Sequence, residues 1–142
     1  MEKPTVFVIQ APRQSATGSI NVDMSSAADF GTVEFVLPSH AQPSIDPDGA
    51  LKTMREAFER FKPGDYICSI GGDPAGIFLA GLCLPESFDG EIKWLRWERK
   101  FDEAGHRRTN GGFYIPTKIN LGYEDEEPIQ PTTFIDKRKP KF

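Results

Sequence analysis

The pattern of apolar and polar positions along the chain predicts strands that alternate with helices. Two short runs rich in β-branched and aromatic residues, Thr5 to Ile9 and Thr32 to Leu37, are typical of strands. Between them, Ser25 to Asp29 indicates only a short helical turn. From Ala50 to Phe61, apolar residues recur every three or four positions and charged residues fill the others, which predicts an amphipathic helix.

The stretch from Gly64 to Leu84 is the most apolar part of the chain, and the remaining elements are organised around it. It opens with Tyr66 to Ile70, a run typical of a strand that is covered on both faces. Asp73 followed by Pro74 is a favourable helix start, with an N-cap carboxylate and a proline at the first helical position. The residues from Ala75 to Leu84 are small or apolar all round, which predicts a helix packed on several sides.

The second half of the chain predicts a long antiparallel hairpin, with strands over Ile92 to Lys100 and Phe113 to Leu121. Pro116 suits an edge strand. We therefore predict one α/β or α+β domain over residues 1–121, with a mixed sheet of about five strands and two main helices in the order β-β-α-β-α-β-β. Residues 122–142 combine an acidic run, prolines and a basic end, which predicts an extended or disordered tail.

Composition narrows the classes of function only slightly. A net charge of −4 over 142 residues does not single out nucleic acid or membrane as a partner. Apolar runs fall short of the roughly 20 residues that a membrane span needs, so we expect no membrane partner. Two cysteines favour a reducing cytoplasm over a disulfide scaffold. The cysteines and histidines show no metal-ligand spacing and no motif of nucleophilic catalysis, so we expect no metal, no cofactor and no enzymatic activity.

The turn formed by Gly71, Gly72 and Asp73 allows two interpretations. A strand, a glycine turn and a helix N-terminus together can hold an anion, and these three residues are a candidate anion-binding turn. Asp73, however, places a carboxylate where a phosphate would lie, and it can satisfy the helix N–H groups itself. We favour a capped helix and keep a small-molecule or nucleotide site as the alternative.

The predicted hairpin interleaves cations with aromatic rings, a pattern typical of single-stranded nucleic-acid binding because phosphates pair with Arg and Lys while bases stack on rings. Acidic residues between them cancel part of this charge, and successive residues of one strand point to opposite faces. We call the candidate set the basic–aromatic surface. It consists of Lys93, Arg96, Trp97, Arg99, Lys100, Arg107, Arg108 and Tyr114.

Four short motifs lie in the predicted strands and at the start of the second main helix. They are Gly64-Asp65-Tyr66, Gly72-Asp73-Pro74, the run from Leu95 to Arg99, and Tyr114-Ile115-Pro116. In these motifs the chain resembles a set of small proteins encoded by tailed bacteriophages. The resemblance covers roughly residues 30 to 121 and departs from the set in the hairpin loop and the tail. It implies phage origin and brings no activity and no site residue with it.

These observations favour a non-enzymatic phage accessory protein in the host cytoplasm. It would bind a host or phage macromolecule, preferably nucleic acid or the machinery that processes it, through the basic–aromatic surface and the tail. The first alternative is a structural virion component, a capsid or tail accessory subunit. The second is a small-molecule or nucleotide binder at the turn of Gly71 to Asp73.

Overall fold

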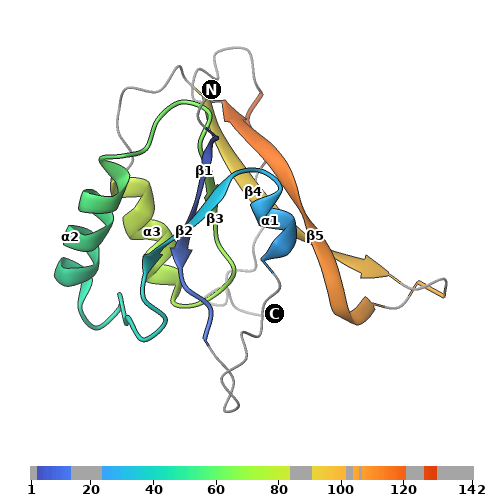
Figure 1. Cartoon of the computed structure of the whole chain (residues 1–142), viewed down its shortest axis with the longest axis horizontal. Coiled ribbons are helices and arrows are strands. Elements are labelled where there is room, and N and C mark those ends of the chain that lie inside the picture. The colour runs from blue at the N-terminus through green and yellow to red at the C-terminus, as the bar shows by residue number, and fades with distance from the viewer. Residues whose placement is uncertain are drawn as a thin grey trace, which may run out of the picture.

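A five-stranded mixed sheet lies at the centre of the computed structural model, which describes residues 3–13, 24–83, 91–101, 104–105, 107–120 and 127–130 (Figure 1). Two helices cover one face of the sheet and one short helix lies on the other. The predicted fold class and order of elements are therefore confirmed. The elements are β1 (Thr5–Gln10), α1 (Ser25–Ala28), β2 (Thr32–Leu37), α2 (Pro47–Phe58), β3 (Tyr66–Cys68), α3 (Pro74–Cys83), β4 (Glu91–Phe101) and β5 (Arg107–Asn120).

The strands lie in the order β2-β1-β3-β4-β5. The first four are mutually parallel, and β5 runs antiparallel to β4 at the edge. The chain leaves β1 for β2 on one side and then crosses back over β1 to reach β3 on the other side. This reversal makes a topological switch point, where the carboxyl ends of β1 and β3 open a crevice that open α/β sheets use for ligands.

Strand β1 is buried on both faces because it contributes to two separate cores. Phe7 and Ile9 pack with residues of α2 and α3, whereas Val6 and Val8 pack on the opposite face with Ala27 of α1. The alternation follows from the two-residue period of a strand. Because both faces of β1 are covered, its position in the sheet requires a run of apolar residues without polar breaks.

Helix α2 begins and ends earlier than the apolar period predicted. Asp46 caps it by accepting a hydrogen bond from the Gly49 N–H at 3.0 Å, and Pro47 takes the first helical position. The helix ends at Phe58 and is followed by a tight turn, in which the Phe61 N–H donates to the Phe58 carbonyl at 3.1 Å. This turn keeps the Phe61 side chain buried. The apolar stripe thus continues into the turn after the helix.

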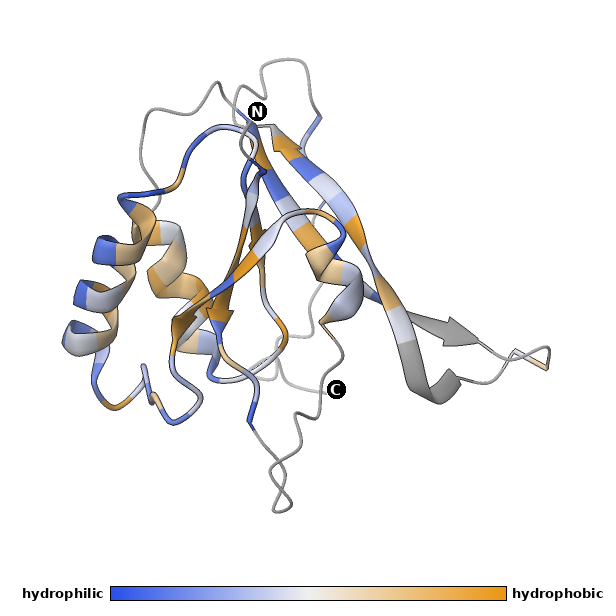
Figure 2. Cartoon of the chain, viewed as in Figure 1, coloured by the Kyte–Doolittle hydropathy of each residue, from blue (hydrophilic) through white to orange (hydrophobic). Residues whose placement is uncertain are grey.

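The prediction that α3 packs on several sides is wrong, because only one side of the helix is covered. Gly76, Leu79 and Ala80 face the core, while Phe78 and Leu82 are largely exposed. Figure 2 shows the contrast with α2, which carries hydrophilic residues outward, whereas α3 is apolar along its length. No helix in the described part of the chain has the length and apolar content to cross a membrane.

The predicted hairpin is present, and β5 is longer than expected. It starts at Arg107 and not at Phe113, and a register irregularity between Arg99 and Phe101 accompanies the extension. Pro116 pairs with Leu95 on the edge strand, where its missing N–H does not interrupt the sheet. The far end of the hairpin projects beyond the rest of the sheet (Figure 1). The predicted tail lies outside the described residues except for residues 127–130.

Candidate functional site

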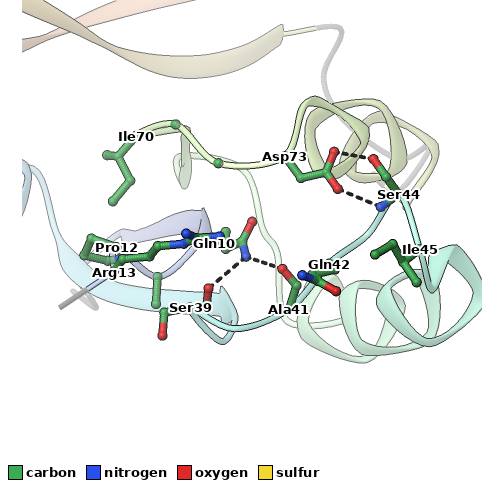
Figure 3. A pocket seen from close by; sticks show the side chains of 13 residues that line it. Gln10, Pro12, Arg13, Ser39, Ala41, Gln42, Ser44, Ile45, Ile70 and Asp73 are labelled. Atoms are coloured by element: carbon green, nitrogen blue, oxygen red, sulfur yellow. Dashed lines mark hydrogen bonds between the residues drawn. The ribbon is translucent and has the colours of Figure 1, made fainter. Parts of the chain in front are cut away.

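A pocket of about 540 Å³ opens at the carboxyl ends of β1 and β3, at the topological switch point (Figure 3). We call it the β1/β3 pocket. Its walls come from the end of β1 and the residues after it, from the loop between β2 and α2, and from the turn before α3. The predicted turn residues Gly71, Gly72 and Asp73 all line it. The other lining residues are Gln10, Ala11, Pro12, Arg13, Ser39, Ala41, Gln42, Ser44, Ile45 and Ile70.

Gln10, the last residue of β1, is the buried polar group of this pocket and is only 8% exposed. Its amide nitrogen donates to the Ala41 carbonyl at 2.7 Å and lies at 3.3 Å and 3.4 Å from the carbonyls of Pro38 and Ser39. Three carbonyls around the nitrogen fix the orientation of the carboxamide. Its oxygen therefore points away from that loop, and Figure 3 shows it on the side of the turn before α3.

Asp73 connects the start of α3 to the loop between β2 and α2. One carboxylate oxygen accepts from the Ala75 N–H at 3.0 Å and from the Ser44 hydroxyl, and the other accepts from the Ser44 N–H at 2.7 Å. The carboxylate thus satisfies the helix N-terminus, as the capped-helix interpretation expects. Because a negative charge occupies this position, the turn favours hydrogen-bond donors over anions.

The Ser44–Asp73 contact is expected to weaken only in acid. Hydrogen bonds from the Ser44 side chain, the Ser44 backbone and the Ala75 backbone lower the pKa of Asp73 from 3.8. A lowered folded-state pKa means that the contact contributes fully above the ordinary pKa and is lost as pH falls through the folded value. In an NMR titration the Ser44 amide should therefore shift with a midpoint below 3.8, and Asp73→Asn should abolish that step. A midpoint at or above the ordinary value would contradict the contact.

The exposed side of α3 is a second candidate surface, which we call the outer face of α3. Its residues follow the spacing of one helix face, and the ten-residue helix contains no charged side chain. Ile77, Phe78 and Leu82 are 45%, 68% and 58% exposed. A solvent-facing helix side normally carries charges, so this side is typical of a surface that another molecule covers. The outer face consists of Pro74, Ile77, Phe78, Gly81 and Leu82.

The structure divides the predicted basic–aromatic surface between the two faces of the sheet. Lys93 lies over the Tyr66 ring, 5.4 Å from its centroid, on the α1 side. Arg96 is an odd number of positions away along β4, so it points to the opposite side, where it forms an ion pair with Glu98. The described cations are therefore not gathered on one surface.

The two aromatic members of that surface are committed to packing. Tyr114 is only 4% exposed and belongs to the core on the α1 side. Trp97 is half-buried and meets the Tyr114 ring edge to face, with 4.9 Å between centroids. Tyr114 is thus unavailable for stacking on a base, and the Trp97 ring already has a partner. The side chains of Arg99, Lys100, Arg107 and Arg108 lie outside the described part of the structure.

The thiols and histidines do not assemble into a catalytic or metal site within the described residues. Burial raises the pKa of the Cys68 thiol to about 11, against a smaller lowering by the Tyr114 hydroxyl, so it stays protonated and unreactive at neutral pH. His40 lines a second pocket, of about 410 Å³, beside the loop between β2 and α2. Among the described residues no three side chains of His, Cys, Asp or Glu lie close enough together to hold a metal ion.

Sequence reasoning missed Gln10, Ser44 and the outer face of α3. A signal existed for two of these features. Gln10 is a polar residue that ends a buried strand, and strand ends are where α/β sheets place ligand groups. The absence of any charge in α3 is visible in the sequence, but this pattern predicts a helix packed on several sides and not an exposed apolar face. Ser44 gave no local signal, because its partner Asp73 lies 29 residues further along the chain.

Comparison with known proteins identifies a family and adds no activity. The model of the phage Pam3 gp32-like protein family matches residues 4–104. No curated protein and no solved structure matches the chain. The phage family that the resemblance implied is thereby confirmed, while the pattern of four short motifs stays a prediction. Because the match covers most of the chain, including every strand except β5, the chain belongs to the phage Pam3 gp32-like protein family.

Proposed function

We propose that this phage protein acts by binding another protein through the outer face of α3. The observation that carries the proposal is a helix that has no charged side chain and yet exposes half of its circumference. Exposed apolar residues that are contiguous, and not scattered singly, mark interaction sites on soluble proteins. We place this action in the host cytoplasm, where a phage accessory protein meets its partners, and the partner is a host or phage protein.

The shape of the outer face favours a helix as the binding partner. Gly81 lies between bulkier neighbours, and a Cβ built on it would have no heavy atom within 4 Å, so it forms a notch. Ile77 and Phe78 stand one turn before it and Leu82 directly after it, so they border the notch. Small residues between large ones allow two helices to approach closely, and amphipathic helices commonly bind into such apolar grooves.

A cation near the end of α3 adds a preference for a partner with an acidic residue. Burial raises the pKa of the Cys83 thiol at the end of α3. Arg55 of α2 lies close enough to oppose this rise with its positive charge. Arg55 is exposed, and no ion pair of it is described. We therefore propose an amphipathic helix whose apolar stripe covers the outer face and whose acidic residue lies next to Arg55.

The test compares capture of partners by matched serine variants. Tagged wild-type protein and the variants Phe78→Ser, Leu82→Ser and Phe35→Ser are used to recover proteins from lysates of infected cells, with and without nuclease treatment. Phe35 of β2 is 42% exposed and lies outside the outer face, so it serves as the control. We expect one partner to be retained by wild type and Phe35→Ser and lost by both α3 variants, with affinity reduced at least about tenfold for a central apolar residue.

A second variant separates docking from stability. Gly81→Ala should raise the free energy of unfolding by up to about 1 kcal/mol, because alanine is the better helix former and the site has room for a methyl group. The same methyl group fills the notch and should weaken partner binding. A partner that Gly81→Ala, Phe78→Ser and Leu82→Ser all retain at wild-type affinity would refute docking at α3, and loss of every partner on nuclease treatment would indicate contact through nucleic acid.

A further inference from the structure

The β1/β3 pocket lies where a fold of this topology holds small ligands. Its volume of about 540 Å³ falls within the range of roughly 300–1,000 Å³ that is usual for such sites. It lies on the carboxyl edge of the parallel strands and is lined by residues from three separate segments. The outer face of α3 does not share its lining, because none of the residues that line the pocket belongs to that face. The pocket is therefore a feature independent of the proposed protein interface.

Gln10 gives the pocket a fixed hydrogen-bond acceptor. Gln10 as a whole residue is 92% buried, and the Ala41, Pro38 and Ser39 carbonyls hold its side-chain nitrogen, so the carboxamide cannot turn over without placing oxygen against oxygen. The oxygen receives no hydrogen bond from any described residue. It faces the glycine turn, and a Cβ built on Gly72 would lie 2.8 Å from it. No buried side-chain N or O atom of the described residues lacks a partner, so this oxygen lies at the accessible surface of the pocket wall, where a ligand can supply an N–H or O–H group to it.

The rest of the lining specifies the shape and charge of that ligand. Asp73 is a second acceptor, since its carboxylate oxygen that bonds the Ser44 N–H has lone-pair capacity left. Aliphatic side chains, including Ile70 and Pro12, provide apolar walls. Glycine at 71 and 72 leaves this side of the pocket without side chains, and a Cβ on Gly71 would meet nothing within 4 Å. Such a site suits a flat heterocycle with N–H donors on one edge.

Arg13 supplies a cation at the exposed rim of the pocket. A guanidinium group binds phosphate in a bidentate manner, and a phosphate attached to the heterocycle would reach the rim while the ring stays inside. Inorganic phosphate alone does not fit the interior, because Gln10 and Asp73 both present acceptors there. The donors must therefore belong to the ring, and the negative charge to a substituent on it.

We infer that the β1/β3 pocket binds a purine nucleotide, with an N–H edge of the base on the Gln10 carboxamide oxygen and the Asp73 carboxylate, and with the phosphate on Arg13. A purine offers the larger flat surface to the aliphatic walls, and its exocyclic amino or ring N–H groups meet the two acceptors. Binding involves no covalent step.

In the experiment, the full chain is titrated and binding is monitored by calorimetry and by amide NMR. The ligands are guanosine monophosphate, adenosine monophosphate, uridine monophosphate, guanosine and inorganic phosphate. We expect a purine monophosphate to bind saturably and to shift the amides of Gly71, Gly72 and Asp73. Arg13→Ala should weaken the monophosphate about threefold to fivefold, as loss of an exposed charge pair does, and leave guanosine binding unchanged. Lys52→Ala, an exposed cation of α2 outside the pocket, should change neither.

Gln10→Ala tests the acceptor directly and should weaken nucleotide and nucleoside alike, by about tenfold for one buried hydrogen bond. Because that variant also frees three carbonyls, its folding is checked by circular dichroism, and the Arg13→Ala comparison holds even if Gln10→Ala unfolds. Three results would overturn the inference: no saturable binding of either purine nucleotide at millimolar concentration, inorganic phosphate or uridine monophosphate binding as tightly as the purines, or shifts confined to residues outside the pocket. None of these results would bear on docking at the outer face of α3.

Discussion

Replacing Asp65 with alanine is expected to lower the free energy of unfolding by about 4 kcal/mol, because it removes a buried carboxylate and leaves several partly buried donors without their acceptor. Asp65 is only 2% exposed. One carboxylate oxygen accepts from the Thr5 N–H at 2.8 Å and from the Lys62 ammonium at 3.2 Å, and the other accepts from the Lys62 N–H at 3.0 Å. The carboxylate thus joins the start of β1 to the turn before β3. A loss of this size is a large fraction of the stability of a small domain.

Urea denaturation measures this loss as a lower midpoint with an unchanged slope. Asp65→Asn should fall between wild type and alanine, because the amide keeps one acceptor but turns a donor toward another donor. Asp48→Ala is the matched control. Its carboxylate is exposed in the first turn of α2, so its loss should cost less than about 1 kcal/mol. An Asp65→Ala variant within the range of that control would show that water replaces the carboxylate as acceptor.

Strands and helices were predictable where a local period determines them. Runs of β-branched and aromatic residues located β1 and β2 to within a residue, and the proline after an aspartate located the start of α3. The hairpin followed from two strand-like runs separated by a glycine-containing loop. These features need only neighbours along the chain, so the sequence contains the information for them.

Burial of a whole helix face was not predictable, because it depends on how many layers cover the element. An all-apolar helix has the same sequence whether a second layer covers it within one chain or in a complex. In α3 the core covers Leu79 and leaves Phe78, its direct neighbour, exposed. The same limit applies to the β1/β3 pocket. The orientation of the Gln10 carboxamide is fixed only by carbonyls about 30 residues away, in the loop after β2.

The basic–aromatic surface illustrates the limit for strands. Cations and aromatic rings that are close in sequence were grouped together, yet the period of a strand sends neighbours to opposite faces. Lys93 and Arg96 point to opposite sides of the sheet, and Tyr114 is in the core. Which side is core depends on where α1, α2 and α3 pack, and the local pattern of β4 does not contain that information.

Replacing Gly112 with alanine is expected to destabilise the hairpin by about 3 kcal/mol, the upper range for inserting a methyl group into a packed site. A Cβ at Gly112 would lie 2.3 Å from the Trp97 ring and 2.6 Å from the Glu98 carbonyl oxygen. Displacement of the indole relieves the first contact, whereas the second involves the β4 backbone, which can shift only by straining its ladder with β5. The Trp97 indole N–H resonance should therefore shift, together with the lower midpoint of unfolding. Gly81→Ala is the control, because its methyl group meets nothing.

The same variant decides whether Trp97 can serve as a stacking platform for nucleic acid. In the native hairpin the ring packs on Gly112 and against Tyr114, which leaves only part of its surface for a base to stack on. Gly112→Ala displaces the ring in advance, so single-stranded DNA that binds through Trp97 should bind this variant more tightly than wild type. If neither wild type nor Gly112→Ala binds single-stranded DNA detectably, Trp97 has a purely structural role. Its ring then covers a glycine of the edge strand, which is a known way of stabilising such positions. An unshifted indole resonance in Gly112→Ala would instead contradict the packing of Trp97 on Gly112.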